Sequence, residues 1–262
     1  MDRASGPAAA IRHARSLALI TGFLGLVGLS LAGCTSSSSS PGAGSSPGTA
    51  TASPGLSVPG THQATSRYQI TAPVRTVVIV SHVGNVTVNG GNGPAVSVTQ
   101  QVYYSKTPPT TTRTVSGNTL TVTYDCSVQL VCGVAYTLAV PRSVAVRVTA
   151  GAGAVRLTGL AGSVIAKADV GLINATGLTS ASVSLTTRVG GISASFTAAP
   201  TTVQASANVG AITVRVPGAA SYKVTADARV GKTTISAPQS ASSGHAITAT
   251  TDVGAIVVAP ST

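Results

Sequence analysis

The chain has 262 residues and a mass of 25.5 kDa, enough for one ordinary domain with tails or for two small domains. Only 8% of its residues are charged, the formal net charge is +11, and the five acidic side chains are all aspartates. Aromatic residues make up 3% of the chain, and tryptophan is absent. This composition argues against an enzyme built on a carboxylate cluster and against a nucleic-acid surface of stacked aromatic rings.

Residues 1–33 have the layout of a bacterial export signal. Basic residues precede an uncharged apolar run over 17–33. The run ends in Leu-Ala-Gly-Cys at 31–34, which resembles the lipobox of bacterial lipoprotein signals. The resemblance implies that the mature chain begins at Cys34 and is lipid-anchored through its thiol at the extracytoplasmic face of the cell membrane. The alternative is an uncleaved signal anchor in which Cys34 is incidental.

Residues 34–66 begin with this cysteine and continue as a stretch rich in Ser, Thr, Pro and Gly, including a pure serine run over 36–40. The stretch has few apolar side chains and almost no charge, so it cannot repay the entropy cost of folding. We therefore expect a flexible linker, which could carry O-linked sugars.

A repeated Val-Gly unit organises the rest of the chain, residues 67–262. A polar residue precedes the Val-Gly pair in most copies, and an alternating Ile-x-Val or similar follows it. From Gly153 onward the unit recurs roughly every 20 residues, a period typical of a solenoid. The glycines should allow a turn with positive φ or a close backbone approach. The turn glycines are Gly84, Gly153, Gly171, Gly190, Gly210, Gly231 and Gly254.

The pattern predicts an all-β fold, a parallel β-solenoid with coils of about 20 residues. Each coil should hold two strands bent at the glycine, with successive coils about 4.8 Å apart. Alternation predicts two buried columns, with Thr233 as a flaw in the second. The first column holds Val170, Val189, Val209, Val230 and Val253, and the second holds Ile173, Ile192, Ile212 and Ile256.

The polar residues before the Val-Gly pairs should form an outward ladder in which no two like charges are neighbours, which would help fix the register. In chain order they are Asp169, Arg188, Asn208, Arg229 and Asp252. A catalytic alternative uses Asp227 and Asp252, expected ~8 Å apart, a separation compatible with inverting glycoside hydrolysis. Arg229 should lie between these two carboxylates and argues against that alternative.

The stretch from Arg67 to Val148 is less regular and predicts a β cap at the amino end of the solenoid. Strands are expected near 77–80, 96–103, 120–124 and 134–140, with a loop over 107–114. Four tyrosines either plug the amino end of the stack or form an aromatic contact surface: Tyr103, Tyr104, Tyr124 and Tyr136. At the other end we expect the last strand to be an open pairing edge.

Three cysteines are present, and lipidation of Cys34 leaves Cys126 and Cys132. In an exported protein such a pair favours a disulfide over a metal site. A redox-active pair is the alternative, although the spacing is not that of a CxxC motif.

The runs over 120–126 and 132–141, together with the repeated Val-Gly-x-Ile-x-Val, resemble the bacterial putative adhesin domain family. The resemblance covers about residues 70–259 and implies a β-solenoid on an exported or lipid-anchored protein. This chain departs from the family in carrying Val before the turn glycine, with the polar residue one position earlier.

We therefore expect a non-enzymatic, lipid-anchored module for adhesion or envelope binding. Its partners would be the membrane through the lipid, and an anionic envelope polymer or a surface protein; no nucleic acid, cofactor or metal is expected. The histidines His62, His82 and His245 lack metal-ligand spacing, and His82 should belong to the outward ladder. The alternatives are an enzyme acting on envelope polysaccharide and a scaffold or sensor partner of a membrane protein.

Overall fold

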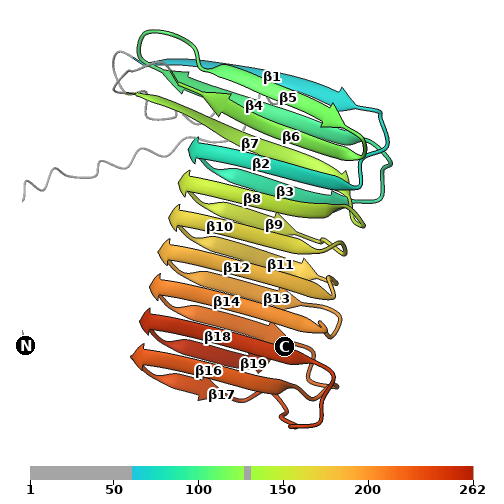
Figure 1. The fold of residues 1–262 in the computed structure, drawn as a ribbon, viewed down its shortest axis with the longest axis vertical. Helices are drawn as coiled ribbons and strands as arrows, with labels where there is room; N and C mark the ends of the chain where they lie inside the picture. Colours follow the sequence, from blue (N-terminus) through green and yellow to red (C-terminus); the bar gives the residue numbers. More distant parts are fainter. Residues whose placement is uncertain (1–60, 127–130, 262) are drawn as a thin grey trace, which may run out of the picture. The chain divides into compact units, whose positions relative to one another are not determined.

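The structure is a computed structural model that describes residues 61–126 and 131–261. These residues form strands, turns and loops with no helix, so the all-β prediction is confirmed. Two sheets, of ten and nine strands, run the length of the stack (Figure 1). Cys34 and the predicted export signal lie outside the described residues.

The strands of both sheets follow a spatial order that differs from their order in the chain. In spatial order, the ten-stranded sheet holds β1 (His62–Ile70), β4 (Val96–Tyr104), β7 (Cys132–Pro141), β3 (Val86–Gly91), β9 (Val155–Thr158), β11 (Ile173–Leu178), β13 (Ile192–Phe196), β15 (Ile212–Val216), β19 (Ile256–Pro260) and β17 (Thr233–Ile235). The nine-stranded sheet holds β16 (Lys223–Val230), β18 (Ala246–Val253), β14 (Thr202–Val209), β12 (Ser182–Val189), β10 (Val164–Val170), β8 (Ala145–Ala152), β2 (Thr76–Val83), β6 (Thr119–Asp125) and β5 (Thr110–Ser116).

Each regular coil consists of one strand from each sheet joined at a turn glycine, and neighbouring coils pair in parallel. All seven predicted turn glycines have positive φ. The coils approach closely there: a Cβ on Gly210 would lie 1.8 Å from the carbonyl oxygen of Gly190. Both expected roles of the glycine, the φ angle and the close approach, are therefore confirmed.

The core between the sheets consists of small and branched apolar side chains. The predicted isoleucine column is confirmed, since all four of its members are buried. Thr233, predicted as a flaw in this column, lies in register with Ile256 at the end of the stack and is exposed.

The predicted valine column is wrong, because its members are exposed rather than buried. In β14, Ala207 is buried, but both Asn208 and Val209 are exposed, so the in-out alternation stops where the chain leaves the sheet. At the inner corner, two of the coils carry a threonine whose hydroxyl donates to a turn carbonyl. Thr187 Oγ1 donates to Gly171 O over 3.2 Å, and Thr251 Oγ1 donates to Gly210 O over 3.0 Å.

The order of the coils in space differs from their order in the chain. The last coil, β18–β19, lies between β14–β15 and β16–β17 and pairs with both. The expectation that the last strand is the open edge is therefore wrong: β16 and β17 form that edge (Figure 1). The amino end shows the same rearrangement, because the β6–β7 coil lies outside the β2–β3 coil.

The irregular amino-terminal cap is built from β1, β4 and β5, which pair antiparallel with their neighbours. β1 begins at His62, so residues 62–66 form a strand rather than part of a spacer. The expected loop over 107–114 is also wrong in part, because β5 begins at Thr110. This strand is exposed and follows two prolines, so its sequence has no alternating hydrophobic pattern that would predict a strand.

Two of the four tyrosines support the plug interpretation. Tyr124 and Tyr136 are buried at the amino end of the core, while Tyr103 and Tyr104 are half-exposed. The Tyr124 hydroxyl donates to Val83 O over 2.7 Å and accepts from Val83 N. Burial raises the pKa of Tyr136 well above its usual range, with Tyr68 and Tyr124 adding to the effect.

The disulfide between Cys126 and Cys132 is confirmed, with the two Cα atoms 6.1 Å apart. It joins the end of β6 to the start of β7, where the regular coils have a turn glycine. The β6–β7 coil therefore carries a disulfide where the regular coils carry a Val-Gly pair.

Candidate functional site

The edge of the stack at the turn glycines carries an unbroken row of exposed apolar side chains, one per regular coil. We call this row the valine ladder. Ladder pairing places its residues side by side, with Ala152 between the first two valines. The exposed fractions lie between 46% and 60%, and in spatial order the valines are Val83, Val170, Val189, Val209, Val253 and Val230.

An apolar row of this kind is unusual on a solvent-exposed protein surface. Single exposed valines need no explanation, but a continuous apolar strip along one edge is typical of an interaction surface. At ~4.8 Å per coil the strip is roughly 29 Å long. Leu172, 60% exposed and just beyond its turn glycine, widens it.

The predicted outward ladder lies beside the valine ladder, and we call it the charge ladder. Its neighbours touch: Arg188 Nε lies 3.8 Å from Asp169 Oδ1, and Arg229 Nη2 lies 3.4 Å from Asp252 Oδ1. Asn208 Nδ2 donates to Asp252 Oδ2 over 3.3 Å. Asn208 therefore neighbours Asp252 rather than Arg229, so the spatial order is Asp169, Arg188, Asn208, Asp252, Arg229.

The carboxylates of the enzymatic alternative do share a shallow hollow of about 250 Å³ on this face. Asp227 is exposed, and Asp252 is occupied by the contacts to Arg229 and Asn208. A general acid needs a site that shields it from water and from a neutralising cation. This hollow offers neither, so it resembles an ion-paired surface more than an active site.

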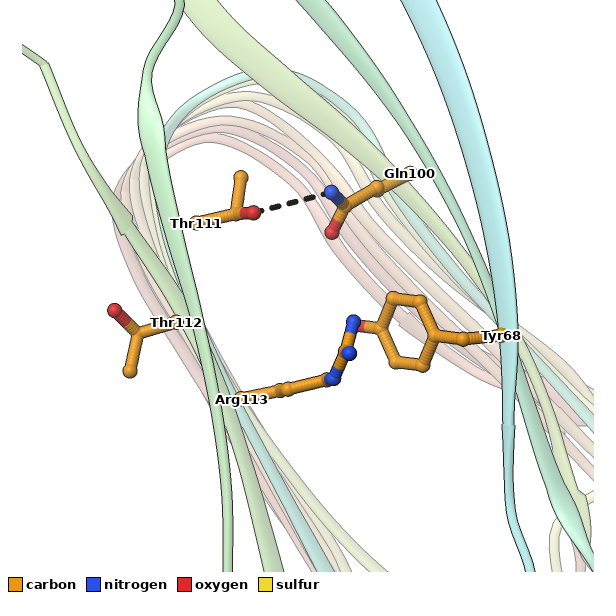
Figure 2. A pocket seen from close by; sticks show the side chains of 5 residues that line it. All are labelled: Tyr68, Gln100, Thr111, Thr112 and Arg113. Atoms are coloured by element: carbon orange, nitrogen blue, oxygen red, sulfur yellow. Dashed lines mark hydrogen bonds between the residues drawn. The ribbon is translucent and has the colours of Figure 1, made fainter.

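A second hollow, of about 350 Å³, lies at the amino end of the stack (Figure 2). The Arg113 guanidinium lies over the Tyr68 ring, 4.4 Å from its centroid, a cation–π contact. Gln100 Nε2 donates to Thr111 Oγ1 over 3.1 Å on the opposite side. Burial raises the pKa of Tyr68, an effect that the Arg113 charge partly offsets. Arg113 and Gln100 already have partners, so this hollow shows structural packing rather than open ligand-binding groups.

The histidines do not gather. His62 stacks on Tyr104, His82 meets the Tyr124 ring edge-on, and His245 Nδ1 lies 2.8 Å from Pro200 O. Across residues 61–126 and 131–261 no group of His, Cys, Asp or Glu could hold a metal ion. The same residues contain no helix long and apolar enough to cross a membrane.

Sequence reasoning found the charge ladder but assigned the valines to the core. A usable clue was present: each valine directly precedes a glycine expected at positive φ, where the chain leaves the strand and alternation no longer holds. The hollow at Tyr68 and Arg113 was missed because both residues lie on strands outside the repeat.

Comparisons with known proteins give matches among solved structures but no family. No family model and no curated protein matches the chain. A structure described as a putative cell adhesion protein from Clostridium sporogenes matches with 14% identity and a TM-score of 0.46, covering 76% of this chain and 100% of that one. A putative adhesin from Bacteroides fragilis matches with 16% identity and a TM-score of 0.45, covering 76% and 97%.

Proposed function

We propose that this chain is a non-enzymatic adhesion module of the cell surface, which binds through its turn edge. The valine ladder carries the proposal. Six exposed valines, aligned coil by coil, form an apolar strip that the charge ladder borders on one side. That arrangement is typical of protein interfaces, and a rigid stack of sheets holds it without a cost in ordering on binding.

The proposal places the module outside the cytoplasm, tethered through a lipid on Cys34. The Cys126–Cys132 disulfide supports an oxidising compartment. The lipobox at 31–34 supports the tether, and the linker could reach ~100 Å from the membrane when fully extended. Cys34→Ser should release the protein from membranes or leave the precursor unprocessed; unchanged retention and mass would contradict the anchor.

Without the predicted signal over 1–33 the chain has 13 basic and 4 acidic side chains, and this net charge of +9 supports an anionic envelope polymer or an acidic surface as the first contact. Charge alone gives binding that fades with salt, whereas apolar contact at the valine ladder should persist. Persistence in salt therefore separates a specific adhesive surface from generic basic charge.

The test is sedimentation of residues 54–262 with isolated cell envelopes at low salt and at ~0.5 M salt. These residues form one compact unit that contains β1 to β19. A triple variant, Val189→Thr/Val209→Thr/Val253→Thr, keeps side-chain shape and β-branching but makes the strip polar. Val115→Thr, at an exposed valine of β5 away from the turn edge, is the matched control.

We expect saturable binding that survives the salt, at least a tenfold loss in the triple variant, and no loss in the control. Binding that vanishes in salt, or equal binding by the triple variant and Val115→Thr, would refute the proposed surface.

A further inference from the structure

The charge ladder has a symmetry that depends on the order of the coils in space. Read along the stack, its signs are minus, plus, neutral, minus, plus, from Asp169 to Arg229 with Asn208 in the centre. A two-fold rotation about Asn208 generates a second copy of this series, in which each charge faces a charge of the opposite sign in the first copy. Asp169 meets Arg229, and Arg188 meets Asp252.

We infer that the turn edge binds a second copy of this chain in an antiparallel, two-fold symmetric dimer centred on Asn208. A two-fold interface is self-complementary, because each contact occurs twice. Here the dyad produces four opposite-charge contacts between the copies. The charged side chains are available for them, since the four are between 45% and 78% exposed despite their pairs within the chain.

The charges select this register over the others nearby. Moving the dyad by half a coil in one direction sets Asp169 against Asp252, and in the other direction sets Arg188 against Arg229. A parallel arrangement sets every charge against its like. Like charges in contact suppress a wrong arrangement more strongly than opposite charges reward the right one.

The exchange of the last two coils creates this complementarity. Had the coils stacked in chain order, the series would be minus, plus, neutral, plus, minus, and a two-fold axis at Asn208 would pair like with like. Because β18 lies between β14 and β16, Asp252 takes the place next to Asn208 and the series becomes self-complementary.

The same axis aligns the two valine ladders. Val209 meets its own copy on the axis, Val189 faces Val253, and Val170 faces Val230. Since the strip is narrow, we expect the contact area to be below that of a standard interface and the dimer to be weak. Tethering to a surface would raise the local concentration and strengthen such contacts.

In this dimer the amino-terminal caps lie at opposite ends. With the proposed lipid anchor, this orientation would allow two copies on facing membranes to pair. This consequence rests on the proposed function, whereas the dimer itself does not.

Cross-linking at the dyad tests the geometry, using residues 54–262 and a short bis-maleimide. Asn208→Cys should link to its own copy, because position 208 lies on the axis. Gln204→Cys is the control: it is exposed on the same strand, ~13 Å away from position 208, so its two copies are held far apart. Equal cross-linking of the two variants, or none at 208, would overturn the proposed axis.

Charge reversal tests the contacts, with the dissociation constant measured by sedimentation equilibrium. Arg229→Glu should weaken the dimer at least tenfold, because it twice sets a new carboxylate against Asp169. Adding Asp169→Arg should restore the dissociation constant to within about threefold. Within one chain the double variant is worse, since it places two guanidinium groups side by side at positions 169 and 188, and two carboxylates side by side at positions 229 and 252. Rescue therefore cannot come from monomer stability, and failure of rescue would refute the pairing.

The two proposals fail differently. Loss of self-association with intact, salt-resistant binding to envelopes would overturn the dimer and leave the adhesive edge in place. A dimer that forms while envelopes fail to bind would overturn the envelope partner alone.

Discussion

The replacement Gly210→Ala tests the central physical claim about the coils, that the turn position admits only glycine. The φ angle of Gly210 is +154°, and an added Cβ would lie 1.8 Å from Gly190 O and 2.5 Å from its carbonyl carbon. A non-glycine residue at such an angle costs about 1–3 kcal/mol. The clash is with backbone, so relief requires two coils to separate and their ladder bonds to weaken, for a total loss of about 3–5 kcal/mol.

The assay is urea unfolding of residues 54–262, followed by far-ultraviolet circular dichroism. Gly244→Ala is the matched control, since Gly244 lies in an exposed loop with no atom within 4 Å of an added Cβ. The control should be neutral or slightly stabilising, by up to ~1 kcal/mol. A free energy of unfolding for Gly210→Ala within ~1 kcal/mol of the control would show that the turn tolerates side chains and refute the reasoning.

Three further predictions concern the amino end and the buried tyrosines. Cys126→Ser/Cys132→Ser should lower the free energy of unfolding by about 2 kcal/mol, the loop entropy of a short closure, and reductant should reproduce this in the wild type but not in the variant. Tyr124→Phe should cost about 1–2 kcal/mol by removing the hydroxyl that bonds Val83; an unchanged urea midpoint would contradict it. Burial raises the pKa of Tyr136 above the ordinary value of 10.0, so the folded chain holds this proton more tightly, and its stability should be complete below about pH 10 and fall as pH rises further. Phenolate absorbance titrated in the folded and the urea-unfolded protein checks the sign, which would be wrong if the folded curve did not lie at higher pH.

The regular part of the fold was predictable from the sequence because its constraint is local. A glycine that needs positive φ, followed by an alternating strand, defines one coil. Because the coils are nearly equal in length, their equivalent residues align when the coils stack. The isoleucines could be placed in the core because they lie two residues after the glycine, inside a strand where alternation holds. The same alternation fails for the valines, because they lie at the corner, where the chain leaves the sheet, and their side chains are exposed.

The order of the coils was beyond this reasoning for a different reason. The strands Lys223–Val230 and Ala246–Val253 carry similar patterns, and either could pair with Thr202–Val209 in the same register. Because the alternating pattern does not distinguish the two arrangements, tertiary packing decides between them. Only the spacing between Gly231 and Gly254, wider than in the earlier coils, hinted at the difference.

The position of β18 and β19 affects how the folded chain loses its order from an end. In a simple repeat stack the last coil in the chain is also the outermost coil, so it unfolds locally before the others. Here that segment has a neighbour on each side, and releasing Ala246–Pro260 would break two ladders in each sheet where a terminal coil breaks one. The coil that can fray is therefore β16–β17, which comes earlier in the chain, while β18–β19 is held between two neighbours. Amide hydrogen exchange should therefore be faster in β16 and β17 than in β18 and β19.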